Sequence, residues 1–156
     1  MSSSVNSTSG QYGVRRRSRE MAVQLLFQYQ FHGQFRTPPQ GQESDGKDLL
    51  KKFVTDFEIE SEIADYGGTL FLGVLEQIEK IDELIQAHSA HWKVSRMGLV
   101  DLSVMRVAVY EMKFVSPALQ PNIVINEAVE IAKKFGSTES GSFVNGILDH
   151  IARNLK

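Results

Sequence analysis

The sequence contains no cysteine. Disulfide bridges and thiolate-bound metals both need cysteine sulfur, so both are excluded, and the absence agrees with a reducing compartment. Histidine is scarce as well, with 4 residues in 156. His88 and His91 lie three positions apart, a spacing that metal sites use on helices, but no third ligand accompanies them. We therefore expect neither a metal ion nor another cofactor, and we interpret these histidines as satisfied or exposed side chains.

Long apolar runs are also missing. No stretch approaches the roughly 20 apolar residues of a membrane-spanning helix, and the N-terminus has no apolar segment that could serve as a signal peptide. We therefore expect a cytoplasmic protein that stays out of the membrane. With 42% apolar and 23% charged residues, the chain has an ordinary globular composition, and its length suits one domain or two small subdomains that share a core.

Recognisable catalytic groupings are missing too. The sequence holds no Ser/His/Asp or Cys/His arrangement that can be placed, and no glycine-rich cofactor loop follows a strand. The acidic pair Glu58 and Glu60 is typical of a solvated hinge. We therefore expect a protein that is not an enzyme.

What the sequence does contain is a strong asymmetry of charge. Residues 1 to 20 carry four arginines and one glutamate, a net charge of +3, whereas the rest of the chain carries −5. One basic end on an acidic body indicates a localised contact with a polyanion rather than a protein coated in positive charge.

A helix that follows the arginine cluster is the central feature of the chain. Residues 15–30 place apolar side chains at i, i+3, i+4 and i+7, which predicts an amphipathic helix that begins near Arg17 or Ser18. Its apolar stripe consists of Ala22, Leu25, Leu26 and Tyr29. Arginine at a helix N-terminus opposes the helix dipole, and such local violations tend to mark functional sites. The alternative is a solvated run of charge.

The rest of the chain also favours helices, about seven segments in all. The first 12 residues are rich in serine with one aliphatic side chain, so we predict a disordered tail over residues 1–14, followed by a single helical domain over residues 15–156. Further helices are predicted, after a loop at 32–47, over residues 48–57, 63–88, 99–115, 123–135 and about 138–155. The run 99–115 is apolar on nearly every side and too long for a typical strand, which indicates a central buried helix.

Two residues outside these stripes carry predictions of their own. Gly146 lies inside the last predicted helix, where it weakens the helix unless another helix passes close. Trp92 is expected to anchor the short connector over residues 89–97.

Five motifs, taken together, resemble the NusB family of bacterial transcription antitermination proteins. In chain order they are RRRSRE, MAVQLLFQY, LSVMRVAVYEM, PNIVINEAVEIAKKFG and SFVNGILDHIA. The resemblance covers residues 15–153 apart from the loop 32–47. It implies an all-α fold of two three-helix subdomains, in agreement with the helical periodicity.

The resemblance also implies a function. NusB-like proteins bind boxA, a short single-stranded RNA element, and pair with NusE, a small-subunit ribosomal protein. The pair helps RNA polymerase to read through terminators in ribosomal RNA operons. By this resemblance the expected partners are boxA RNA, NusE and the RNA polymerase antitermination complex. A homodimer is a further state that such a helical domain can adopt.

The family's site residues are carried over by position. Among the four arginines, Arg16 and Arg19 are the expected direct contacts with RNA. The implied RNA face consists of Arg15, Arg16, Arg17, Arg19, Glu139, Ser142 and Phe143, and the implied partner-protein face consists of Phe27 and Asp101. Two positions depart from the family: Ser142 stands where many relatives have a basic residue, which removes a possible phosphate contact. Phe27 stands where some have tyrosine, which keeps the aromatic packing without the hydroxyl.

Single-stranded RNA suits these residue types. Guanidinium groups pair with phosphates and stack on bases, and unpaired bases stack on aromatic rings, for which Phe143 is the candidate. Two alternatives stay open. RNA methyltransferases can carry a NusB-like domain, although this sequence shows no cofactor loop. A helical protein-interaction module would not bind boxA-type RNA at moderate salt.

Overall fold

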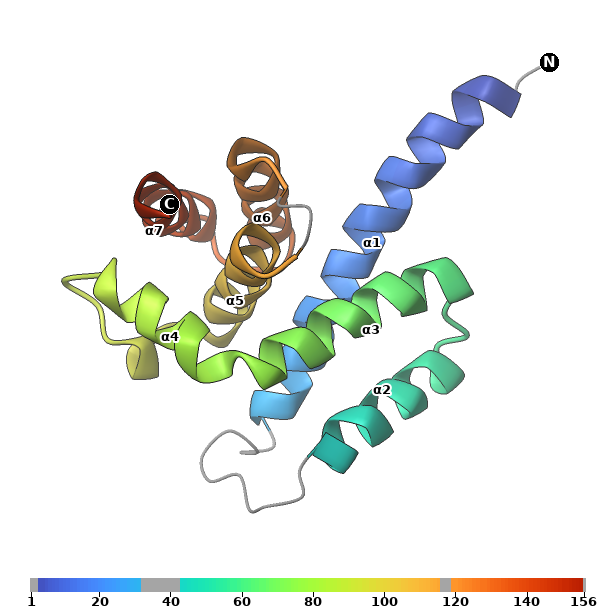
Figure 1. The fold of residues 1–156 in the computed structure, drawn as a ribbon, viewed down its shortest axis with the longest axis horizontal. Helices are drawn as coiled ribbons and strands as arrows, with labels where there is room; N and C mark the ends of the chain where they lie inside the picture. The colour runs from blue at the N-terminus through green and yellow to red at the C-terminus, as the bar shows by residue number, and fades with distance from the viewer. Residues whose placement is uncertain (1–2, 32–42, 116–118, 156) are drawn as a thin grey trace. The chain divides into compact units, whose positions relative to one another are not determined.

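The computed structural model describes the backbone of residues 3–31, 43–115 and 119–155, and the side chains of residues 13–31, 46–115 and 119–155. The described residues form seven α-helices, one short 3-10 helix and no strand, which confirms the all-α class. The helices are α1 (Ser3–Phe31), α2 (Glu43–Asp56), α3 (Ser61–Glu76), α4 (Ile78–Ala87), η1 (Val94–Arg96), α5 (Leu99–Lys113), α6 (Pro121–Phe135) and α7 (Ser140–Asn154) (Figure 1). None of these helices is both long and apolar enough to cross a bilayer.

The chain divides into two compact units, Met1–Leu72 and Gly73–Lys156. The first unit contains α1, α2 and most of α3, and the second contains the end of α3 together with α4 to α7. The expected division into three-helix subdomains therefore describes the first unit, whereas the second holds four complete helices.

Two predicted helix starts differ from the structure. Helix α1 begins at Ser3 and not near Arg17, so the backbone from residue 3 is helical where we predicted a disordered tail over residues 1–14. Once a helix is anchored by packing, each further residue adds a hydrogen bond without a new nucleation cost, which lets α1 extend through a sequence of low apolar content. Helix α2 begins at Glu43, within the predicted loop 32–47; the earlier part of that loop, residues 32–42, lies outside the described residues.

The first unit packs three helices against one another through small residues on α3. The predicted apolar stripe of α1 is buried, and Tyr29 meets Phe71 of α3 edge to face, with ring centroids 6.0 Å apart. A Cβ at Gly67 would lie 3.0 Å from the Ser18 carbonyl oxygen of α1, and one at Gly68 would lie 3.0 Å from a methyl group of Leu50 of α2. The glycine pair therefore lets α1 and α2 approach α3 closely.

A break at Gln77 separates α3 from α4, where the sequence predicted one helix over residues 63–88. The Gln77 amide divides its hydrogen bond between the carbonyl oxygens of Gly73, at 3.1 Å, and Val74, at 3.2 Å. Gly73 lies one turn earlier, and a Cβ there would overlap the Tyr110 ring of α5. A backbone amide shared between the i−3 and i−4 carbonyl oxygens is common at helix ends.

Helix α5 is the central helix of the second unit, as predicted. It contacts α4, α6 and α7, and ten of its residues are buried, including charged ones. Arg106 is paired in a bidentate ion pair with Asp82 of α4, with both nitrogen–oxygen distances at 2.8 Å. The pair joins α4 to the bundle and satisfies a buried guanidinium.

The close helix that would justify Gly146 is not found in the described part of the chain. A Cβ at this position in α7 would meet no atom within 4 Å, so no neighbouring helix within the described residues requires a glycine there.

Candidate nucleic-acid interface

The four arginines of the predicted motif lie on α1 but differ in exposure. Arg15 and Arg17 are exposed and Arg16 is half-buried, whereas Arg19 is only 6% exposed. The two most exposed guanidinium groups are thus not those that the family pattern places first, since Arg16 and Arg19 were the expected direct contacts.

The position of Arg19 follows from helical geometry. Arg19 precedes Ala22 by three positions, Val23 by four and Leu26 by seven, so it shares a helix face with buried residues. That spacing was visible in the sequence and predicts a side chain whose stem packs into the protein. Arg15 lies one turn earlier on the same side of the helix and is still exposed, whereas Arg17 lies on the other side.

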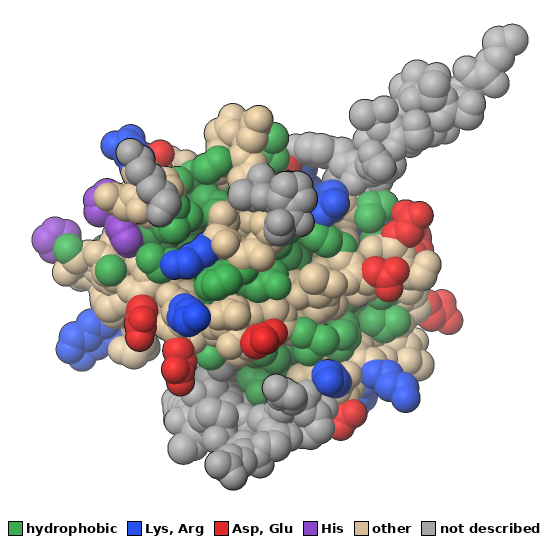
Figure 2. Space-filling view, in the orientation of Figure 1, with side chains coloured by type: hydrophobic (Ala, Val, Ile, Leu, Met, Phe, Trp, Pro, Cys, Tyr) green, Lys and Arg blue, Asp and Glu red, His purple; other side chains and the backbone are tan. Residues whose placement is uncertain are grey.

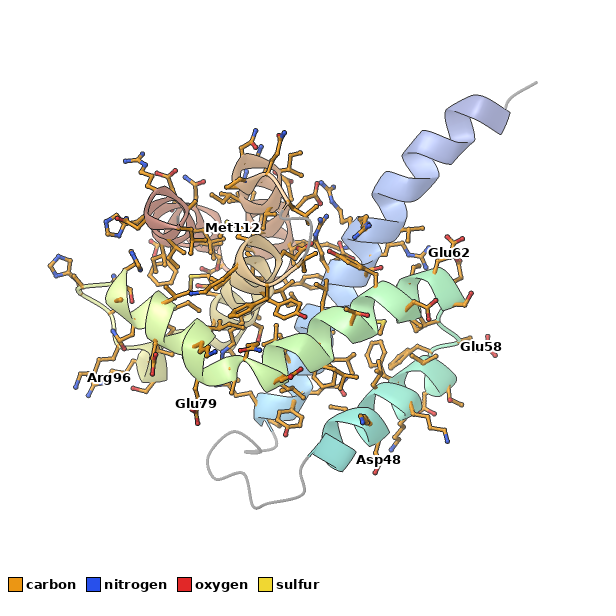
Figure 3. The ribbon with its side chains drawn as sticks, in the orientation of Figure 1. Asp48, Glu58, Glu62, Glu79, Arg96 and Met112 are labelled. Carbon is orange, nitrogen blue, oxygen red and sulfur yellow. The ribbon has the colours of Figure 1, made fainter. Side chains whose placement is uncertain are left out.

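The exposed arginines rest on the beginning of α3. The Arg15 guanidinium lies 4.0 Å from the centre of the Tyr66 ring, a cation–π contact. Arg17 lies 3.6 Å from a carboxylate oxygen of Glu60, and both side chains of this pair are more than half exposed. Figure 3 shows two further carboxylates nearby: Glu58 in the connector before α3 and Glu62 in the first turn of α3. These contacts orient the arginines along the surface while leaving them accessible to solvent.

The second group of predicted RNA residues lies at the start of α7. Glu139 occupies the N-cap position, and the Ser142 hydroxyl donates a hydrogen bond to the Glu139 carbonyl oxygen at 3.1 Å. Both side chains are exposed, and Phe143 is half-buried. Phe143 therefore presents part of its ring at a surface that is otherwise polar.

Trp92 is the residue that the sequence reasoning missed at this site. We expected it to anchor the connector, but its side chain is 57% exposed. Its ring meets the Phe143 ring edge to face, with centroids 5.7 Å apart and planes at 86°. The available signal was that a large aromatic residue stands in a short polar connector between two helices.

The two residues of the predicted partner-protein face lie on different helices. Phe27 of α1 is half-buried and stacks on Phe31 with ring centroids 6.1 Å apart and planes at 12°. Asp101 is half-buried in the first turn of α5, where a carboxylate complements the helix dipole. The two residues therefore have different local surroundings, one on α1 and one on α5.

The predicted site residues are divided between the two units. The first unit holds the four arginines and Phe27, and the second holds Glu139, Ser142, Phe143 and Asp101.

Histidine side chains gather at one edge of the molecule (Figure 2). The rings of His88 and His150 meet edge to face with centroids 4.9 Å apart, and His88 Nδ1 lies 2.8 Å from the Leu84 carbonyl oxygen. Among the residues that the structure describes, no group of three or more His, Asp or Glu side chains could hold a metal ion. The ring contact packs the C-cap residue of α4 against α7.

Fold and surface together define a class: an all-helical protein, over its described residues, with an arginine cluster on one helix and a pair of aromatic rings beside the start of another. The family model described as "NusB family" matches residues 16–153. This chain therefore belongs to the NusB family. Membership confirms the expectation of a non-enzymatic protein.

Curated relatives support the assignment over nearly the full length. The chain is 44% identical over 142 residues to the transcription antitermination protein NusB of Bdellovibrio bacteriovorus, covering 90% of this chain and 96% of that one. It is 40% identical over 141 residues to the protein of the same name from Desulfosudis oleivorans, covering 90% and 86%.

Solved structures share the fold. NusB of T. maritima has a TM-score of 0.72 at 33% identity, with 89% of this chain and 90% of that chain covered. A crystal structure of the antitermination factors NusB and NusE in complex with dsRNA gives a chain with a TM-score of 0.76 at 25% identity, covering 91% and 98%.

Proposed function

We propose that this protein is a transcription antitermination factor that binds boxA-type single-stranded RNA together with NusE and promotes read-through in ribosomal RNA operons. Family membership supports the proposal, as do relatives named antitermination proteins. A similar structure of NusB and NusE in complex with dsRNA supports RNA and NusE as partners, and the single-stranded class is inferred from the arginine and aromatic side chains. The observation that carries it is the arginine cluster of α1, because two guanidinium groups are exposed on a helix whose following turns are buried.

The chemistry of the exposed arginines suits a phosphate backbone. Guanidinium groups form bidentate hydrogen bonds to phosphate and are weakly hydrated, so they leave water at a lower cost than ammonium groups. The contacts of Arg15 with Tyr66 and of Arg17 with Glu60 limit side-chain motion before RNA binds. When a phosphate replaces Glu60 as the partner of Arg17, little free energy is lost, because an exposed ion pair contributes at most about 1 kcal/mol.

The remaining predicted residues have distinct proposed roles. Phe143 stacks on a base, and Ser142 and Glu139 offer hydroxyl and carboxylate groups to base edges or ribose hydroxyls. Arg16 contributes a direct phosphate contact. The burial of Arg19 suits a residue that fixes the orientation of α1.

The protein-partner proposal rests on Phe27 and Asp101. A half-buried aromatic ring and a half-buried carboxylate are suited to a protein interface, since aromatic residues often dominate binding energy. NusE is the proposed partner at these residues, within the RNA polymerase antitermination complex in the cytoplasm. A homodimer of the free protein is the competing state. Sedimentation velocity on the free protein shows whether it is a monomer or a dimer.

Fluorescence anisotropy with a labelled boxA-type RNA, with and without NusE, tests the proposal. Arg15→Ala combined with Arg17→Ala removes two exposed cations, so affinity should fall and the slope of log affinity against log salt should become shallower by about 1.4, at ~0.7 per phosphate contact. Affinity should rise when NusE is added.

A matched control has the same change in net charge elsewhere. Lys51→Ala combined with Lys52→Ala removes two exposed cations from α2, and it should leave the salt slope unchanged. Equal slopes for both double variants would show that the protein responds only to net charge. If the wild type ignores RNA at moderate salt but binds NusE, the protein is an interaction module and the RNA proposal fails.

A further inference from the structure

We propose that Trp92 and Phe143 form a two-ring site that holds two neighbouring unpaired bases of the RNA, so that Trp92 is a base-binding residue in its own right. This inference rests on the proposed function and extends it to a residue outside the predicted site. Trp92 is 57% exposed and lies against Phe143, with ring centroids 5.7 Å apart. In this edge-to-face contact, the edge of one ring points at the face of the other.

The connector holds Trp92 in place by its backbone. The Gln86 side chain donates a hydrogen bond to the Trp92 carbonyl oxygen at 3.0 Å and accepts one from the Val94 amide at 3.0 Å. The Trp92 amide donates to the Ser89 carbonyl oxygen at 3.0 Å, and the buried Ser89 hydroxyl donates to the Ile85 carbonyl oxygen at 2.6 Å. An exposed ring on a fixed backbone loses little conformational entropy when a ligand stacks on it.

Phe143 is held just as firmly from the other side. It lies in the first turn of α7 next to the fully buried Val144, on a helix that packs against α5 and α6. Both rings of the proposed site therefore belong to the second unit and are fixed by its core.

The angle between the rings favours unpaired bases. Their planes meet at 86°, so bases that stack on the two rings cannot stay parallel to each other. A duplex keeps successive bases parallel, whereas sequence-specific recognition of single-stranded RNA splays them apart. The geometry therefore fits single-stranded RNA and not a double helix.

Positive charge flanks the tryptophan. Lys93 follows it directly, and Arg96 ends the next helical turn, η1; both are exposed. Figure 3 shows Arg96 projecting outward from this turn. Two cations beside an exposed indole match a phosphate backbone whose bases stack on the ring, and this charge favours RNA over an apolar protein surface as the occupant.

Trp92 also supplies its own reporter, because it is the only tryptophan in the chain. Unlabelled boxA-type RNA is added to the full-length wild-type protein while tryptophan emission is recorded, and a labelled copy of the same RNA is followed by anisotropy. The inference predicts that emission is quenched with the same dissociation constant that anisotropy gives.

Two substitutions separate base stacking from packing. Trp92→Phe keeps a flat ring against Phe143, and its RNA affinity should stay within about threefold of wild type. Trp92→Leu keeps apolar bulk but has no ring, and its affinity should fall about 5- to 150-fold, the range that corresponds to the loss of one aromatic stacking partner. Circular dichroism verifies that both variants keep the helical fold.

The outcomes distinguish this inference from the function on which it depends. If RNA binds by anisotropy but emission is unchanged and Trp92→Leu binds as well as Trp92→Phe, the two-ring site is overturned and the RNA function stands. If emission responds to NusE alone and not to RNA, Trp92 belongs to a protein contact and the inference fails. If wild type binds no RNA with or without NusE, both fail.

Discussion

Arg106 and Asp82 form an ion pair whose guanidinium is almost fully buried, with side-chain exposures of 4% for the arginine and 29% for the aspartate. Removal of the carboxylate leaves a buried charge with a lost partner, which is costly. We expect Asp82→Ala to lower the free energy of unfolding by about 2 to 4 kcal/mol, measured by urea denaturation followed by circular dichroism.

Glu83 offers a neighbouring control. It is exposed on the same helix, so Glu83→Ala should change the free energy of unfolding by less than about 0.5 kcal/mol. Equal urea midpoints for the Asp82 and Glu83 variants would mean that the buried pair adds nothing to stability.

At the residue scale, the sequence identifies the cluster of site residues, but it does not predict how exposed each side chain is. The arginine cluster could be recognised because four guanidinium groups occur within five positions. Their individual surroundings depend on which helix face packs, and Arg19 falls on the buried one. Trp92 could not be assigned to the site at all, because its neighbour Phe143 lies 51 positions away and only the fold brings the rings together.

At the scale of the helix, α7 contains a glycine without a packing role. A Cβ at Gly146 would meet nothing within 4 Å, and glycine inside a helix costs about 0.5 to 1 kcal/mol relative to alanine. Gly146→Ala should therefore raise the free energy of unfolding by this amount and the melting temperature by about 1 to 3 °C, measured by thermal denaturation.

Gly67 provides the opposite case on α3. A Cβ there would lie 3.0 Å from the Ser18 carbonyl oxygen and 3.1 Å from the Met21 sulfur. Gly67→Ala should lower the melting temperature because the backbone of α1 would have to move.

For Gly146 on α7, a loss of stability in Gly146→Ala would contradict the prediction. It would indicate that this glycine meets a requirement absent from the described structure.

The sequence predicted helices correctly where the apolar periodicity was strong. The prediction was less accurate where tertiary contacts determine the helix boundary. The run of α5, apolar on nearly every side and too long for a typical strand, predicted a buried helix, and the structure confirms it. The apolar repeat of residues 63–88 predicted one continuous helix, because glutamine at position 77 is a good helix former. The structure instead ends α3 at Glu76 and begins α4 at Ile78, an interruption that no local pattern of the sequence contains.

At the scale of the whole molecule, the net charge is −2 although the proposed ligand is a polyanion. Binding therefore depends on a few local phosphate contacts. With three to four phosphates neutralised, log affinity should fall against log salt with a slope of about −2 to −3, measured by anisotropy between low and moderate salt. A slope near zero would exclude the arginine cluster as an RNA site.

The division of the molecule was only partly visible in the sequence. Periodicity and motifs identified the helices, but nothing in the composition marks the boundary between Leu72 and Gly73. Domain boundaries usually fall in exposed linkers rich in glycine, proline or polar residues. Here the boundary falls inside α3, among apolar residues of the FLGVLE segment.

That boundary restricts how the protein can be taken apart. A protease that cuts exposed linkers has no linker to cut at this point, and a fragment that ends at residue 72 would interrupt α3 before its last turn. The truncated helix would expose backbone carbonyl groups that normally accept hydrogen bonds from the next turn. Gene fusions and split-protein designs should therefore keep residues 61–76 in one piece.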